Sequence, residues 1–160
     1  MEQQVNRVLN AFYKNTSVGM DSIQNVLEKT TDPNLRRELC NQMKFYRKEQ
    51  TQIRNQMQQQ NVQPKEPGTM AKLCSDLTIQ MRCLGGADSS QIAKLMVEGT
   101  NMGIIQLTQV LHESEQIPDT LRHQGHAFLE KEESVSSGKN KDTSKNCCRY
   151  LPAWSFFSCR

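Results

Sequence analysis

The chain has 160 residues, of which 36% are hydrophobic and 23% are charged, a composition typical of one polar domain with or without a tail. No apolar run approaches the ~18 residues that span a bilayer, and residues 1–7 lack the basic-then-apolar order of a signal peptide. We therefore expect a cytoplasmic protein that does not enter membranes. The formal net charge is +3, but residues 134–160 contribute +4, which leaves −1 for residues 1–133. A folded part without basic surplus argues against nucleic-acid binding.

The first two predicted helices cover residues 5 to about 31 and 33 to about 61. Apolar or small residues recur at three- and four-residue steps, which is the spacing of amphipathic helices. Asp32 and Pro33 predict an N-cap and the first position of the second helix. A turn this short makes the two helices antiparallel neighbours. Their predicted inward stripes are Val5, Leu9, Phe12, Thr16, Gly19, Ile23, Val26, Thr30 and Leu35, Leu39, Met43, Tyr46, Gln50, Ile53, Met57.

The next predicted elements are a connection and a second hairpin. Two prolines within residues 62–68 end the second helix, and a short helix is predicted over residues 70–84, with Thr69 as its cap. Asp88 with Gln91 predicts a capping box for the third long helix, and Pro118-Asp119 begins the last one. The inward stripes are Ile92, Leu95, Met96, Gly99, Gly103, Leu107, Val110, Leu111 and Leu121, Gly125, Phe128, Leu129.

An internal repeat relates the two halves. Residues 16–27 align with residues 100–111 at a constant shift of 84. Glycine inside a helix costs about 1 kcal/mol relative to alanine, so the matched Gly19 and Gly103 predict close approach of two helices. Two such hairpins joined by a long connection predict an all-α antiparallel four-helix bundle with one crossover. The expected domains are a bundle over residues 1–133 (hairpin 5–61, crossover 62–87, hairpin 88–133) and a disordered tail over residues 134–160.

This connectivity resembles the ferritin-like superfamily. Two segments carry the narrower resemblance, namely Asp32-Pro33-Asn34-Leu35-Arg36-Arg37-Glu38-Leu39 and Met102-Gly103-Ile104-Ile105-Gln106-Leu107. They are similar to ferritin-like proteins of anaerobic, often spore-forming, bacteria, and the first is similar more distantly to spore-coat ferritin-like proteins. The resemblance covers residues 1–133. It implies the fold and indicates no activity.

The ligand pattern of metal-binding ferritin-like proteins is missing. That pattern places a glutamate on each of two helices and a Glu-x-x-His pair on each of the others, and no Glu-x-x-His occurs in the chain. Glutamine stands at position 52, three residues after Glu49, and the last helix offers only residues 130–133, Glu-Lys-Glu-Glu. We therefore predict no catalytic residue, cofactor site or metal site. The expected function is a non-enzymatic structural or interaction protein, and the alternative is a metal-handling protein that binds or oxidises iron or manganese.

The histidines are candidate metal ligands. His123, His126 and Glu130 share one face of the last predicted helix, and such a set could bind zinc or copper. At ~100° per residue they lie about 140–200° from the apolar stripe, whereas Glu132 falls within about 40° of it. The three residues are therefore predicted to face solvent. His112 is predicted to end the third long helix, where a cation suits the dipole.

The cysteines and the last residues complete the predictions. The six cysteines show no Cys-x-x-Cys spacing, and Cys40 and Cys74 are predicted to be small, reduced core residues. Three hypotheses remain for residues 134–160: a non-homologous ending without a role, a segment that covers a groove beside the short last helix, or an adhesive or redox-active segment that uses Cys147 and Cys148. Self-association through helix faces left exposed by that short helix is the predicted interaction.

Overall fold

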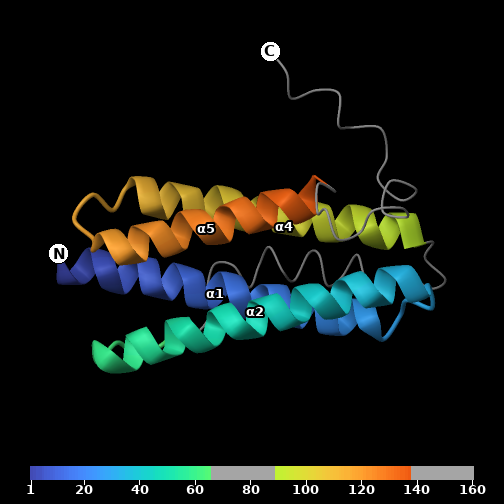
Figure 1. Cartoon of the computed structure of the whole chain (residues 1–160), viewed down its shortest axis with the longest axis horizontal. Helices are drawn as coiled ribbons and strands as arrows, with labels where there is room; N and C mark the ends of the chain where they lie inside the picture. The colour runs from blue at the N-terminus through green and yellow to red at the C-terminus, as the bar shows by residue number, and fades with distance from the viewer. Residues whose placement is uncertain (66–88, 138–160) are drawn as a thin grey trace, which may run out of the picture.

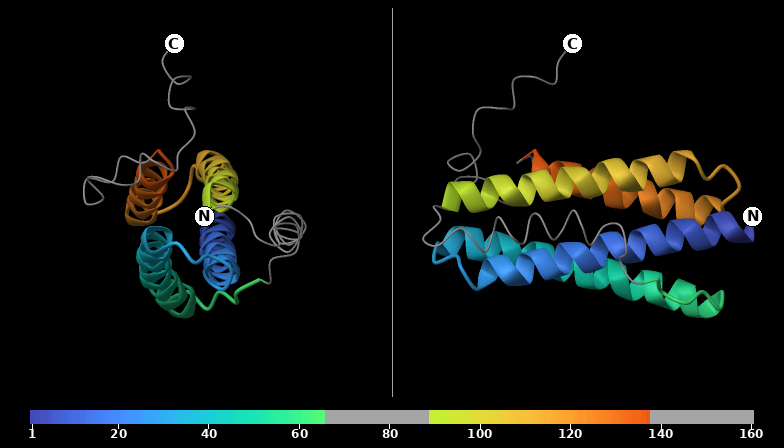
Figure 2. Two further views of the ribbon diagram at one scale, coloured as in Figure 1. Left: turned by 90° about the vertical axis from the view of Figure 1, so that its right-hand side faces the viewer. Right: turned by 180° about the vertical axis from the view of Figure 1, so that it is seen from behind.

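The computed structural model describes residues 1–65 and 89–137. Within these two ranges it contains helices and no strand, and the helices are α1 (Glu2–Leu27), α2 (Pro33–Gln59), α4 (Ser89–His112) and α5 (Asp119–Ser136). The α1–α2 hairpin forms one layer and the α4–α5 hairpin the other (Figure 1). Seen end-on, the helices occupy four corners, with α2 beside α5 and α1 beside α4 (Figure 2). The prediction of an all-α fold is confirmed for the described part of the chain.

The predicted start of α2 is confirmed in detail. The Asp32 carboxylate accepts hydrogen bonds from the backbone N–H groups of Asn34 (2.8 Å) and Leu35 (2.9 Å), with Pro33 at the first helical position, as an N-cap does. The Arg36 guanidinium donates to the carbonyl oxygens of Leu27 and Thr30, which would otherwise lack partners at the end of α1. The helix α1 ends at Leu27, earlier than the predicted end near residue 31.

The core follows the predicted stripes. The α1 helix packs against both α2 and α4, and α4 packs against α5. An aromatic cluster joins the two hairpins: the ring of Phe128 lies 5.3 Å from that of Phe12 and 5.4 Å from that of Phe45. The buried hydrophobic residues are Val5, Val8, Leu9, Phe12, Ile23, Val26, Leu39, Met43, Tyr46, Ile53, Met57, Val62, Ile92, Leu107, Leu111, Ile117, Leu121, Phe128 and Leu129.

Each of three helical glycines faces a side chain of a neighbouring helix. A Cβ atom at Gly19 would lie 2.7 Å from Cζ of Tyr46, and one at Gly103 would lie 2.9 Å from Nδ2 of Asn15. A Cβ atom at Gly125 would lie 2.6 Å from Cδ1 of Leu111. The sequence predicted close approach of two helices at the first two glycines. The structure shows that a side chain, and not a second backbone, fills the space that each glycine leaves.

Two further predictions are wrong. The last helix was expected to stop before residue 134, but α5 continues to Ser136. Serine hydroxyls stabilise this extra turn, because Ser136 donates to Oδ1 of Asn101 (2.8 Å) and Ser137 donates to a carbonyl of the preceding turn. Cys40 was expected in the core but is exposed, because it lies one residue, about 100° around the helix, past the buried Leu39.

Several predictions fall on residues outside the described ranges. They are the short helix within the crossover, its cap Thr69, the capping residue Asp88, the core position of Cys74, and the three hypotheses for the C-terminal tail from residue 138 onward. No helix of the described ranges combines the length and the apolar character needed to cross a bilayer.

Candidate functional site

A buried tyrosine and a buried glutamate meet between the two hairpins. Tyr46 lies on the inward stripe of α2 and Glu132 on that of α5, and they expose only 4% and 3% of their surface. The Tyr46 hydroxyl donates to Oε2 of Glu132 at 2.8 Å. Gly19 leaves room for the Tyr46 ring, because any larger residue at position 19 would collide with that ring. The pair is thus built by three helices, α1, α2 and α5.

Burial determines the electrostatics of this pair. Loss of water raises the pKa of Glu132 to about 7, and the hydrogen bond from Tyr46 opposes that rise only in part. Burial also raises the pKa of the Tyr46 phenol well above its usual value, and the neighbouring Glu132 carboxylate raises it further. A hydrogen bond with Thr100 acts on Tyr46 in the opposite direction. The phenol therefore keeps its proton at neutral pH, while the carboxyl group gains or loses its proton near pH 7.

Other polar side chains in the middle of the bundle have partners within it. Asn15 Nδ2 donates to the Gly103 carbonyl oxygen at 2.9 Å, which ties α1 to α4. Gln50 Nε2 donates to Ser17 Oγ at 2.7 Å, which ties α2 to α1. The Thr16 hydroxyl is satisfied by carbonyl oxygens of its own helix. These hydrogen bonds hold the helices in register. They also satisfy the polar groups that make them without an external ligand.

The carboxylates that could act as metal ligands do not lie together in the described residues. Glu49 is half-buried at the edge of α2, where burial raises its pKa against the opposing effects of Lys48 and Gln124. Glu130 is exposed, and Glu132 faces a phenol. Among residues 1–65 and 89–137 no three His, Cys, Asp or Glu side chains are arranged to hold a metal ion. A second carboxylate beside Glu132, which a di-iron centre would require, is not found among these residues.

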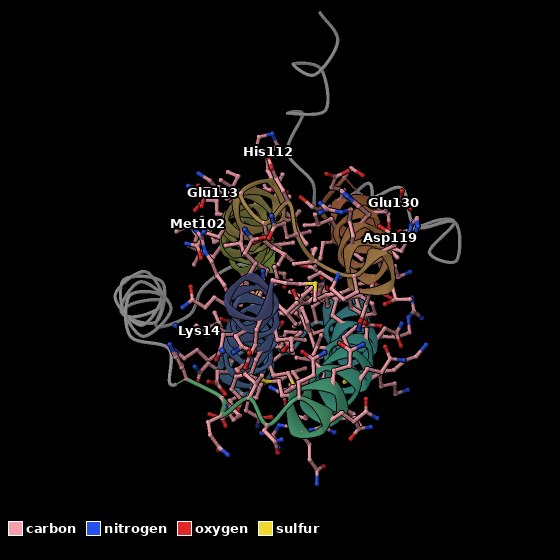
Figure 3. All side chains as sticks on the ribbon, turned by 90° about the vertical axis from the view of Figure 1, so that its left-hand side faces the viewer. Lys14, Met102, His112, Glu113, Asp119 and Glu130 are labelled. Carbon is pink, nitrogen blue, oxygen red and sulfur yellow. The ribbon has the colours of Figure 1, made fainter. Side chains whose placement is uncertain are left out.

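The histidines lie where the sequence placed them. His123, His126 and Glu130 are all exposed on α5, so the prediction that they face solvent is confirmed. His112 is the last residue of α4 and is also exposed. Figure 3 shows Glu130 and Asp119 at the outside of the bundle on α5, with His112 at the end of α4.

A separate groove of about 740 Å³ runs between α1 and α4. Amide and basic side chains dominate its polar lining, including Asn6, Arg7, Asn10, Lys14 and Gln106. No carboxylate or histidine lines it among the described residues, so these residues offer no pair for general acid–base chemistry.

Sequence reasoning placed Glu132 on the inward face but assigned it no partner. Tyr46 was predicted as an ordinary core residue, and Asn15 was not singled out. The available signal was a carboxylate on an otherwise apolar stripe, since a buried charge is costly unless it is paired or neutralised.

Comparisons with protein-family models, curated proteins and solved structures found no match.

Proposed function

We propose that this protein is a non-enzymatic structural or interaction protein, built on a ferritin-like bundle that lacks a di-iron site. One observation carries the proposal: the middle of the bundle is filled by its own side chains. Tyr46 occupies the space at Gly19 and Asn15 the space at Gly103, while the buried Glu132 carboxyl group accepts from a phenol of the same chain. A metal centre between the four helices needs an accessible cavity with converging polar groups, and these contacts take that space, while the groove between α1 and α4 offers no carboxylate or histidine among its described residues.

The course of the chain supports the ferritin-like arrangement. The helix α2 ends near the start of α1, whereas α4 starts at the opposite end of the bundle (Figure 1). Residues 66–88 therefore link opposite ends of the bundle (Figure 1). One long crossover between two hairpins is the connectivity of ferritin-like folds. The 84-residue shift between the two halves agrees with this duplication.

The metal-handling alternative is tested by metal content. The full-length protein would be purified from cells supplied with iron, manganese and zinc, and the bound metal per chain measured by elemental analysis. We expect each metal to stay far below one ion per chain. Near-stoichiometric metal that disappears in Glu132→Gln, but persists in the exposed control Glu130→Gln, would overturn the proposal and place a metal site in the core.

A further inference from the structure

The two hairpins carry opposite charge. Residues 1–65 contain ten basic and six acidic residues, a formal +4, whereas residues 89–137 contain three basic and seven acidic residues, a formal −4. Because these ranges form the two layers of the bundle (Figure 1), the described residues of the two layers carry opposite formal charge. The charge of −1 for residues 1–133 conceals this separation, since it sums over both layers.

The positive charge is concentrated on the outer side of α2. We call Arg37, Lys44, Arg47 and Lys48 the basic face; all four side chains are exposed. The two acidic residues of α2, Glu38 and Glu49, are only half-buried at its edges. Among the described residues, ion pairs join Arg7 to Glu113 and Lys94 to Glu98, and neither pair includes a member of the basic face; Lys48 acts on the neighbouring Glu49 only as a nearby charge.

The negative counterpart lies on α5. We call Asp119, Glu130 and Glu133 the acidic face; these residues are exposed, and the ion pairs Arg7–Glu113 and Lys94–Glu98 include none of them. Of the two basic residues of this helix, Arg122 turns inward to the carbonyl oxygens of Ser114 and Glu115, where it closes the α4–α5 connection. Lys131 is exposed, and the three acids of the acidic face outnumber it.

The Tyr46–Glu132 hydrogen bond shows that the two faces point in opposite directions. At ~100° per residue, Lys44 and Lys48 lie about 160° around α2 from Tyr46, and Glu130 lies about 160° around α5 from Glu132. Tyr46 and Glu132 point toward each other. The basic face and the acidic face are thus turned outward on opposite sides of the same bundle, at the same level along its axis.

We propose that the basic face of one copy of this chain docks on the acidic face of a second copy. This inference rests on the proposed role as an interaction protein and names its partner. A second copy fits because it supplies an exposed helix face with charges of the opposite sign. The contact is heterologous, because it joins the basic face of one copy to the acidic face of the next. In a pair of bound copies, each copy therefore still has one free face, and the size of the assembly increases with protein concentration. Exposed ion pairs are weak and screened by salt, so the assembly is favoured at low ionic strength.

The test is the mass of the full-length protein in solution, measured by sedimentation velocity from micromolar to millimolar concentration. At about 50 mM salt we expect the average mass to rise above the 18.3 kDa of one chain, and at about 500 mM salt to return to it. The double variant Lys44→Glu/Lys48→Glu and the double variant Glu130→Lys/Glu133→Lys should each associate at least about tenfold more weakly, since like charges then face each other. Mixing these two variants should restore association, because each supplies the face that the other has lost.

The control variant is Lys14→Glu/Lys65→Glu, which changes the net charge by the same −4 as Lys44→Glu/Lys48→Glu but lies off both faces. It should associate as the unmodified chain does. Association that survives both reversals, or that the mixture does not restore, would overturn the assignment of the faces. A chain that stays monomeric in low salt yet binds heparin would overturn the second copy as the partner. The metal content is measured separately, so either failure leaves the proposed function standing.

Discussion

Contacts within each hairpin differ in kind from contacts between the hairpins. Within the hairpins, an apolar or aromatic side chain packs on a glycine, Tyr46 on Gly19 and Leu111 on Gly125. Between the hairpins there are two kinds of contact. One is the aromatic cluster around Phe128. The other is a set of directional hydrogen bonds, of which the bond from Tyr46 to Glu132 is the most buried. The glycine contacts depend on shape, and the hydrogen bond from Gln50 to Ser17 within the first hairpin joins two side chains that do not titrate, so neither depends on pH. The contact between the hairpins contains a titratable group, so it depends on pH.

The largest effect is expected from Glu132→Gln compared across pH. The folded pKa of Glu132, about 7, lies above its usual value of 4.5, so the folded state favours the protonated carboxyl group. Its contribution to stability is complete below about pH 4.5, falls as the pH rises to about 7, and is constant above that. At 1.36 kcal/mol per pKa unit, the unmodified chain should lose about 3 kcal/mol relative to Glu132→Gln between pH 4.5 and pH 8. Urea unfolding of both proteins at both pH values measures this difference.

The matched control for this measurement is Glu130→Gln, two residues away and exposed. Its free energy of unfolding should change with pH as that of the unmodified chain does. Equal pH dependence in Glu132→Gln and the unmodified chain would show that Glu132 is not neutralised by burial, and the distinction between the two kinds of contact would then fail.

A smaller loss is expected within the first hairpin from Gly19→Ala. The added Cβ atom would lie 2.7 Å from a ring that is buried and hydrogen-bonded, so the ring has little freedom to move. Overpacking costs about 1–3 kcal/mol, and alanine returns up to about 1 kcal/mol of helix propensity. We expect a net loss of about 2 kcal/mol in the free energy of unfolding. Gly99→Ala in α4, at a half-buried position, is the control, and a loss of similar size there would contradict the steric explanation.

Between the hairpins, Asn15 and Gly103 should behave as one unit. Asn15→Ala removes a buried hydrogen bond to the Gly103 carbonyl oxygen, which is worth about 1 kcal/mol. Gly103→Ala crowds the Asn15 amide, with a loss of similar size. In the double variant the added Cβ atom no longer meets the amide, so the combined loss should be about 0.5–1 kcal/mol smaller than the sum of the single losses. Strict additivity in this cycle would exclude direct coupling.

The sequence predicted well what depends on local spacing. The inward stripes and the Asp32 cap are set by neighbours within one or two turns, and both are confirmed. Cys40 was misplaced because one residue, about 100° around the helix, separates a buried position from an exposed one. The end of α5 was predicted too early because serine is a weak helix former, and the bond from Ser136 to Asn101 crosses to another helix.

The candidate site depended on long-range partners, which spacing does not reveal. Glu132 and Tyr46 are 86 residues apart in the chain, so the inward position of the glutamate was predictable but its partner was not. The charge separation was also missed, because a net charge for residues 1–133 averages over two layers that only the fold separates. Spacing along one helix gives the face of a residue, whereas the chemistry of that residue depends on which other helix it meets.

The smallest effect is expected from removing residues 138–160. The hypothesis of an ending without a role predicts that the hairpin contacts, including the bond from Ser136 to Asn101, are kept when these residues are removed. Truncation after Ser137 should therefore change the free energy of unfolding by less than about 1 kcal/mol, or the melting temperature by less than about 4 °C. A larger loss, reproduced in the full-length variant Trp154→Ser/Phe156→Ser/Phe157→Ser, would show that the C-terminal aromatic residues add a third set of contacts to the core. In that case the hypothesis of an ending without a role would be wrong, and the hypothesis of a segment covering a groove beside α5 would replace it.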